Sequence, residues 1–179
     1  MTRLAKLAFF TILLFASFAS AQVKPRINFD RLLSAFPNLP WDFEIRYVEK
    51  IGPRTDMLRI HFDGSADLVR WRPEYEGSLA SVCHAQLEER MFRRVLELLR
   101  DRDFNNLPSD SEGVVAIART SNETVISVRL GRTIVRKFDR GQLQNDALTQ
   151  IEDALNGIAV SLAADPKSEC DMEPVPAKP

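Results

Sequence analysis

The chain has 179 residues, of which 45% are hydrophobic, and its formal net charge at pH 7 is -1. This near-neutral balance gives no general attraction to nucleic acid or to anionic membranes, so we expect no nucleic-acid partner. The length suits a single domain with a sizeable core.

The first 21 residues are typical of a secretory signal peptide. Arg3 and Lys6 supply the positive start, residues 7–18 are almost wholly apolar, and a small-x-small cleavage site ends at Ala21. Cleavage before Gln22 removes two positive charges and changes the formal net charge from -1 to about -3. No other stretch approaches the roughly 20 apolar residues of a spanning helix. We therefore expect an exported protein, periplasmic or extracellular, with no stable membrane anchor after signal removal.

The N-terminal segment 22–40 contains "NFDRLLSAF", which predicts one short helix that ends before Pro37. A single α+β domain is expected over residues 41–163. Its first strand lies in "WDFEIRYVEK", where polar and apolar residues alternate. Side chains on a strand alternate between the two sheet faces, so Phe43, Ile45 and Tyr47 point inward.

The stretch "HFDGSADLVRW", residues 61–71, predicts a β-hairpin. With Gly64-Ser65 as a two-residue type II′ turn, Ile60 faces Val69 and Leu58 faces Trp71, and all four share one buried face. The same register places these side chains on the outer face: Arg59, His61, Arg70 and Arg72. That face is either a mixed, solvated sheet surface or a cationic face that receives an acidic partner.

Asp63 and Asp67 in the same stretch raise the question of a calcium loop. Such a loop needs oxygen ligands at alternate positions, a distant glutamate and a glycine at its sixth position. The two aspartates supply two ligands on opposite faces of a tight hairpin. We therefore expect no metal and no cofactor.

From His84 the spacing of apolar residues predicts a helix, capped by Ser81 and continuing through Leu98. Residues 113–138 then predict three strands, with turns near Ser121-Asn122 and Gly131, and several registers fit equally well after Gly131. The last helix opens at Asn145 or Asp146. This order, β-β-β-α-β-β-β-α, predicts an α+β fold with an antiparallel sheet of about six strands and two long helices packed on one face.

The C-terminal residues 164–179 contain four prolines and predict a flexible tail. Cys83 and Cys170 are the two cysteines of the chain, and an oxidising compartment favours a disulfide between them. Eight extended residues beyond Leu162 reach up to ~26 Å, which allows the tail to fold back. The alternative is a buried Cys83 with Cys170 free or paired between molecules.

Few residues suit catalysis, since the chain has two histidines and two cysteines. His61 is expected on a hairpin strand and His84 at a helix start, and nothing in the sequence brings them together. The sequence contains no GxSxG, Walker A or GxGxxG motif. We predict no catalytic residue and no metal ligand.

The stretch "RLGRTIVRKFDR" concentrates positive charge around a predicted hairpin. The candidate partner surface consists of Arg129, Arg132, Arg136, Lys137 and Arg140. It suits phosphate, an acidic polysaccharide or an acidic protein. The alternative is a solvated strand edge whose charges discourage aggregation.

The chain resembles small exported bacterial domains of unknown function. The resemblance rests on the run from "FEIRYVEK" through "LRIHFDGSADLVRW", on the helix that ends "LELLRDRDFNNLP", and on the paired strands before a C-terminal helix. Over about residues 41 to 162 the element order is also loosely similar to that of emfourin-type inhibitors of thermolysin-like metallopeptidases. "KIGPRTD" stands where those inhibitors have a glycine-rich loop, so no inhibitor residue is transferred to this chain.

These patterns predict an exported, non-enzymatic domain that binds a protein or another macromolecule of the cell envelope or the medium. Inhibition of a secreted or periplasmic peptidase is the second hypothesis. An enzyme is the third.

Overall fold

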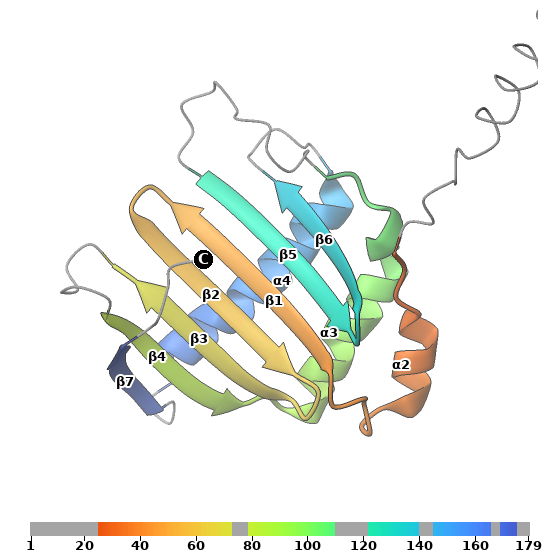
Figure 1. Ribbon diagram of the computed structural model, residues 1–179, viewed down its shortest axis with the longest axis horizontal. Coiled ribbons are helices and arrows are strands. Elements are labelled where there is room, and N and C mark those ends of the chain that lie inside the picture. Colours follow the sequence, from red (N-terminus) through yellow and green to blue (C-terminus); the bar gives the residue numbers. More distant parts are fainter. Residues whose placement is uncertain (1–24, 73–78, 110–121, 140–144, 166–168, 175–179) are drawn as a thin grey trace, which may run out of the picture.

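The computed structural model describes residues 25–72, 79–109, 122–139, 145–165 and 169–174 (Figure 1). In these ranges one antiparallel sheet has the strand order β6-β5-β1-β2-β3-β4-β7. The strands are β1 (Phe43–Ile51), β2 (Arg54–His61), β3 (Ser65–Trp71), β4 (Leu79–Gln86), β5 (Asn122–Leu130), β6 (Thr133–Asp139) and β7 (Glu169–Pro174). The helices are α2 (Phe29–Ala35), α3 (Glu89–Asp101) and α4 (Asp146–Ala164), with a 3-10 turn η1 (Phe104–Asn106) after α3.

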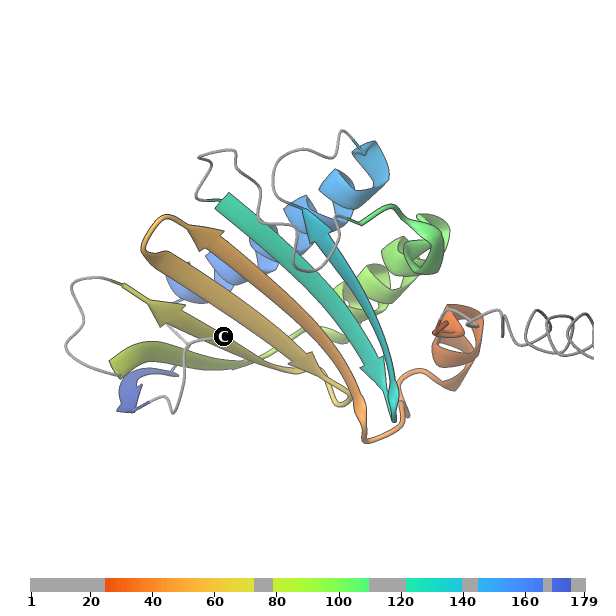
Figure 2. The same ribbon diagram turned by 45° about the horizontal axis from the view of Figure 1, so that its top comes forward.

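Helices α3 and α4 both lie behind the sheet in Figure 1, and Figure 2 shows them running along the back of the twisted strands. The predicted α+β class, with an antiparallel sheet and two long helices on one face, is confirmed. The predicted layout differs in detail, because the described ranges contain seven strands and a third, short helix. We call the sheet face against α3 and α4 the helix side and the opposite face the outer face.

The main core fills the space between the helix side and the helices. Both long helices place apolar residues at every third or fourth position, and this spacing gives each helix one apolar stripe. The buried side chains include Phe43, Ile45, Leu58, Ile60, Leu68 and Val128 from the sheet, and Phe92, Leu96, Leu99, Ile151 and Leu155 from the helices. Burying each such side chain contributes about 1.5–3 kcal/mol.

The hairpin in residues 61–71 forms, but its predicted register is wrong. Ile60 pairs with Ala66, and Leu58 pairs with Leu68. Three residues, Phe62 to Gly64, connect the strands, and Gly64 adopts a φ of +81°, in the left-handed region that glycine favours. The difference from the predicted register is three positions along β3. An odd shift reverses every side chain, so Val69 and Trp71 lie on the outer face instead of against the helices.

The turn itself explains the acidic residues of this stretch. The Asp63 carboxylate accepts hydrogen bonds from the backbone N–H and the hydroxyl of Ser65, at 3.0 and 2.7 Å. These bonds hold the pKa of Asp63 below its ordinary value. Gly64 O accepts from Leu87 N at 3.0 Å, which fastens the turn to the segment before α3. Asp63 is thus a turn residue.

A second, smaller apolar cluster lies on the outer face. Its buried members are Val48, Met57, Val69, Trp71, Ala80 and Val82. Trp71 is only 8% exposed, so it is buried as predicted, but on the opposite side of the sheet. Arg70 and Arg72, predicted on the outer face, belong to the helix side, where the Arg72 guanidinium binds the Asp56 carboxylate.

The segment around Ser81 and His84 is strand β4 and not the start of a helix. Its backbone pairs with β3 on one side and β7 on the other. Cys83 and Leu87 are both buried and four residues apart, which imitates helical spacing in the sequence. Sheet pairing outweighs that local pattern, and α3 begins only at Glu89.

Strand β7 lies in the segment that the sequence predicted as a flexible tail. Cys170 of β7 pairs with Cys83 of β4 in register, and the two residues form a disulfide. The predicted disulfide is therefore confirmed, and it fixes β7 to the edge of the sheet. In the part of the chain described, no helix is both long and apolar enough to cross a membrane.

The remaining elements follow their local signals closely. Asn28 caps α2 by accepting a hydrogen bond from Arg31 N, and α2 ends before Pro37. Residues of α2 share the main core, so the N-terminal segment packs with the domain. Asn145 caps α4 in the same way, and Leu130 pairs with Thr133 across a two-residue turn at Gly131. The strand predicted before Ser121 lies outside the described residues.

Candidate functional site

Antiparallel pairing aligns a row of polar side chains across the outer face, perpendicular to the strands. From β6 to β4 the row comprises Arg136, Ser127, Arg46, Arg59, Asp67 and His84. Directly paired residues of neighbouring antiparallel strands have Cβ atoms about 4.5–5.5 Å apart. We call these six residues the outer-face row. Three arginines occupy its β6–β2 end, and a carboxylate and an imidazole occupy its β3–β4 end.

Arg46 and Arg59 form a like-charge pair at the centre of the outer-face row. Arg46 Nε donates to the sulfur of Met57 at 3.1 Å, while the nearby Glu44 carboxylate binds Arg129 at 3.4 Å. Burial and the Arg59 charge lower the pKa of Arg46; Glu44 opposes this effect, and Arg136 adds to it. Within the described ranges neither Arg46 nor Arg59 has a carboxylate at ion-pair distance. Like charges directly opposite each other destabilise a sheet, by about 0.2–1 kcal/mol.

Both histidines of the chain bind one carboxylate, that of Asp67 on the middle strand β3. His61 Nε2 donates to Oδ2 of Asp67 at 3.0 Å, and His84 Nδ1 donates to Oδ1 at 2.8 Å. Burial acts to raise the pKa of Asp67, but the hydrogen bonds from His61 and His84 outweigh it and lower that pKa. The prediction of His84 at a helix start was wrong: His84 lies on β4 beside Asp67, and this pairing brings together two histidines that no sequence pattern connects.

Ser65 begins β3 beside this cluster, but its hydroxyl donates to Asp63. In the described ranges, no group of three or more His, Cys, Asp or Glu side chains is arranged to hold a metal ion. The outer-face row places three guanidiniums beside a carboxylate and an imidazole, groups that can recognise charge.

The predicted basic surface divides between the two sheet faces. Arg129 and Arg136 are exposed on the outer face, and Arg132 is exposed in the turn between β5 and β6. Lys137 does not belong to that surface, because it is 7% exposed and lies on the helix side. Its Nζ donates to the carbonyl oxygens of Asn105 and Leu107, at 3.1 and 2.6 Å. Strand alternation explains the correction, since Arg136 and Lys137 are neighbours in sequence and point to opposite faces.

Three of the predicted site residues lie outside the described residues. They are Arg140 of the basic surface and Ala21 and Gln22 of the signal cleavage site.

A second polar cluster lies on the helix side, beneath α4. Burial, with Asp139, Asp153 and Glu49 nearby, raises the pKa of Glu152 to about 7. One oxygen of Glu152, Oε1, is buried and has no hydrogen-bond partner among the described residues. Burial and Asp56 also raise the pKa of Glu49, against the effect of its hydrogen bond with Tyr47. This cluster lies on the face opposite the outer-face row, so we expect it to affect the stability of the fold.

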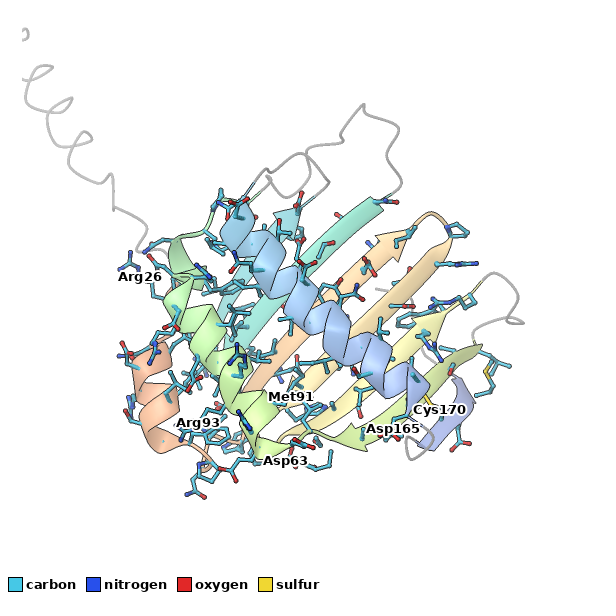
Figure 3. The ribbon with its side chains drawn as sticks, turned by 180° about the vertical axis from the view of Figure 1, so that it is seen from behind. Arg26, Asp63, Met91, Arg93, Asp165 and Cys170 are labelled. Carbon is cyan, nitrogen blue, oxygen red and sulfur yellow. A yellow bond between two sulfur atoms is a disulfide. The ribbon has the colours of Figure 1, made fainter. Side chains whose placement is uncertain are left out.

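A groove of about 740 Å³ runs between α3 and α4, on the side of the molecule seen in Figure 3. Its apolar lining includes Met91, which is labelled there, together with Leu98 and Ile158. Its rim carries both signs of charge, from Arg94 and Asp101 among others. Neither histidine lines this groove, so it does not form a catalytic pocket with them.

Comparison with known proteins adds no assignment: no family model matches the chain, and no curated protein matches it. The outer-face row is thus interpreted from its own geometry. Sequence reasoning placed Arg59 and His61 correctly on this face, but it also placed Arg70 and Arg72 there, which belong to the helix side. It missed the cluster of His61, Asp67 and His84. The three residues lie on three adjacent strands, and their proximity can be inferred only when the register of those strands is known.

Proposed function

We propose that this chain is an exported, non-enzymatic domain that binds an acidic protein through its outer-face row. The observation that carries the proposal is the pairing of Arg46 with Arg59 on adjacent strands, with no carboxylate partner for either among the described residues. A carboxylate of a partner placed between the two guanidiniums makes charge-assisted hydrogen bonds, which are stronger than neutral ones. It also relieves the repulsion between Arg46 and Arg59, so binding recovers stability that the free sheet lacks.

The mixture of charges favours a protein over a uniformly anionic polymer. Glu44 and Asp67 lie on the same face as the two arginines, and they repel a polyanion that covers the whole row. A protein surface presents both signs of charge and can complement such a pattern. On the described strands the outer face offers no exposed aromatic ring for stacking on bases or sugars, because Trp71 is buried and Phe138 is half-buried.

The disulfide supports the export part of the proposal. Disulfides persist in oxidising compartments such as the periplasm and the extracellular space, and they are rare in the cytosol. Cys83 and Cys170 form such a bond, and the N-terminal 21 residues have the pattern of a signal peptide.

Peptidase inhibition remains an alternative that rests on element order. In this chain "KIGPRTD" forms a tight hairpin, in which Ile51 pairs with Arg54 across Gly52 and Pro53. A two-residue turn provides no extended loop for insertion into an active-site cleft. An assay with a purified thermolysin-like peptidase tests this alternative directly, since stoichiometric inhibition by the mature domain would support it.

The test of the proposal compares two double variants that remove the same charge. Arg46→Gln with Arg59→Gln alters the outer-face row, while Arg90→Gln with Arg94→Gln alters exposed arginines of α3. Immobilised mature wild-type protein and both variants are exposed to envelope extract and culture medium, and bound proteins are identified and eluted with salt. We expect an acidic protein to bind the wild type and the α3 variant and to be lost from the outer-face variant.

Thermal unfolding of the three proteins provides the folding control. Because the Arg46–Arg59 pair is repulsive, we expect the outer-face variant to unfold at the same temperature as the wild type or at a higher one. Retention of the same partners by a folded outer-face variant would contradict the proposal. Selective capture of a polysaccharide or nucleic acid by the row would also contradict it, since the partner class would then be different.

A further inference from the structure

The outer-face row changes sign between β2 and β3. Its arginines end at Arg59, and the next residue in the row is Asp67, followed by His84 on β4. With both histidines neutral, the cluster of His61, Asp67 and His84 carries the single negative charge of Asp67. With both protonated, its net charge is positive. The protonation state of two imidazoles therefore decides whether the β3–β4 end of the row repels or attracts an acidic partner.

We propose that His61 and His84 make binding at the outer-face row pH-dependent, with an acidic protein bound more tightly below neutral pH. This inference rests on the proposed function and names its regulation. Histidine is the side chain whose charge ordinarily changes between about pH 5 and 8, and this chain has two histidines, both in the cluster.

The hydrogen bonds allow the charge to change without a change in the fold. His61 and His84 each donate one ring N–H to Asp67, and a protonated imidazole keeps that N–H. The low pKa of Asp67 keeps the carboxylate ionised while the imidazoles gain protons. Protonation thus adds positive charge at a fixed position and strengthens the bonds already present.

Other charged groups on the neighbouring strands also surround the cluster. Glu44 on β1 pairs with His61, and Asp63 lies in the adjoining turn. Arg59 on β2 pairs with Asp67 in register. These residues are left unchanged in every variant of the experiment below, so a pH dependence that is lost with the two histidines is not due to them. Glu152, whose pKa is raised to about 7, lies on the helix side.

The experiment measures the affinity of the mature protein for a short acidic peptide, acetyl-Asp-Gly-Asp-amide, which does not cover the whole row, at low salt and at about pH 5.5 and about pH 8. Each added charge close to a bound carboxylate changes the affinity by a factor of about two to three in a high dielectric, so we expect roughly fivefold tighter binding at the lower pH. In the double variant His61→Gln with His84→Gln, the affinity should be the same at both pH values and close to the wild-type value at pH 8. Asp67→Asn removes the negative charge of the cluster, and we expect it to tighten binding at the higher pH.

The matched control is Glu152→Gln, which removes a carboxyl group whose pKa is raised to about 7 and should leave the pH dependence of binding intact. Equal wild-type affinity at the two pH values would overturn this inference alone, since the proposed binding surface would still be supported. A pH dependence that persists in the double histidine variant would also overturn it. Absence of binding at either pH would overturn the inference together with the proposed function.

Discussion

Replacing Glu152 by glutamine is expected to stabilise the protein at alkaline pH and to leave it unchanged at acid pH. The pKa of Glu152 is raised from 4.5 to about 7 by burial and by Asp139, Asp153 and Glu49. As the pH rises above 4.5 the unfolded chain loses this proton first, while the folded protein retains it until about pH 7. The contribution of Glu152 to folding is thus fully present below pH 4.5, falls between pH 4.5 and about 7, and stays low above that range.

The magnitude follows from the two pKa values. A difference of about 2.5 corresponds to at most about 3.4 kcal/mol, since one pKa unit corresponds to about 1.36 kcal/mol. Glu152 is half-buried, so solvent screens part of this effect, and we expect about 1–2 kcal/mol. Glutamine has a similar helix propensity and carries no charge, so Glu152→Gln imitates the protonated side chain.

The assay is denaturant unfolding of the wild type and the variant at about pH 4 and about pH 8, with the free energy of unfolding extrapolated to water. We expect equal values at the lower pH and a more stable variant at the higher pH. Glu97→Gln makes the same chemical change on α3, where the side chain is also half-buried, and serves as the control. A constant difference between wild type and Glu152→Gln at both pH values would refute the reasoning.

Ile60→Asp should prevent folding or lower the free energy of unfolding by more than about 4 kcal/mol, because it places an unpaired charge at a fully buried position of the main core. Far-UV circular dichroism and the yield of soluble protein report whether the variant folds. A cooperative unfolding transition like that of the wild type would contradict this prediction. Replacing Cys83 and Cys170 together by alanine should lower the free energy of unfolding by about 2–4 kcal/mol, since the bond closes a loop of 87 residues. An unchanged denaturation midpoint would show that the bond does not stabilise the sheet edge. Gly157→Ala should raise stability by about 1 kcal/mol, because the position is inside α4 and an added Cβ meets no atom within 4 Å; a lower melting temperature would contradict it.

Local sequence signals determined those features that depend on a single segment. Alternation in residues 43–47 correctly gave the inward and outward faces of β1, because the period of a strand is two residues. Asn145 and the apolar spacing after it gave α4, because a cap and a helical stripe act within one helix. The disulfide also followed from the sequence, because two cysteines in an expected oxidising compartment leave one intramolecular pairing.

Tertiary structure decided what depends on pairing between segments. The three-residue connection at Gly64 reversed the faces of β3, and no pattern within β3 itself reports that choice, since both faces carry apolar residues. The same register brought Asp67 between His61 and His84, which are 23 positions apart in the chain. Alternation is a property of one strand, whereas register is set by the turn and by the neighbouring strands. For this reason the sequence placed Arg59 and His61 on the correct face, whereas the carboxylate–histidine cluster is evident only in the folded sheet.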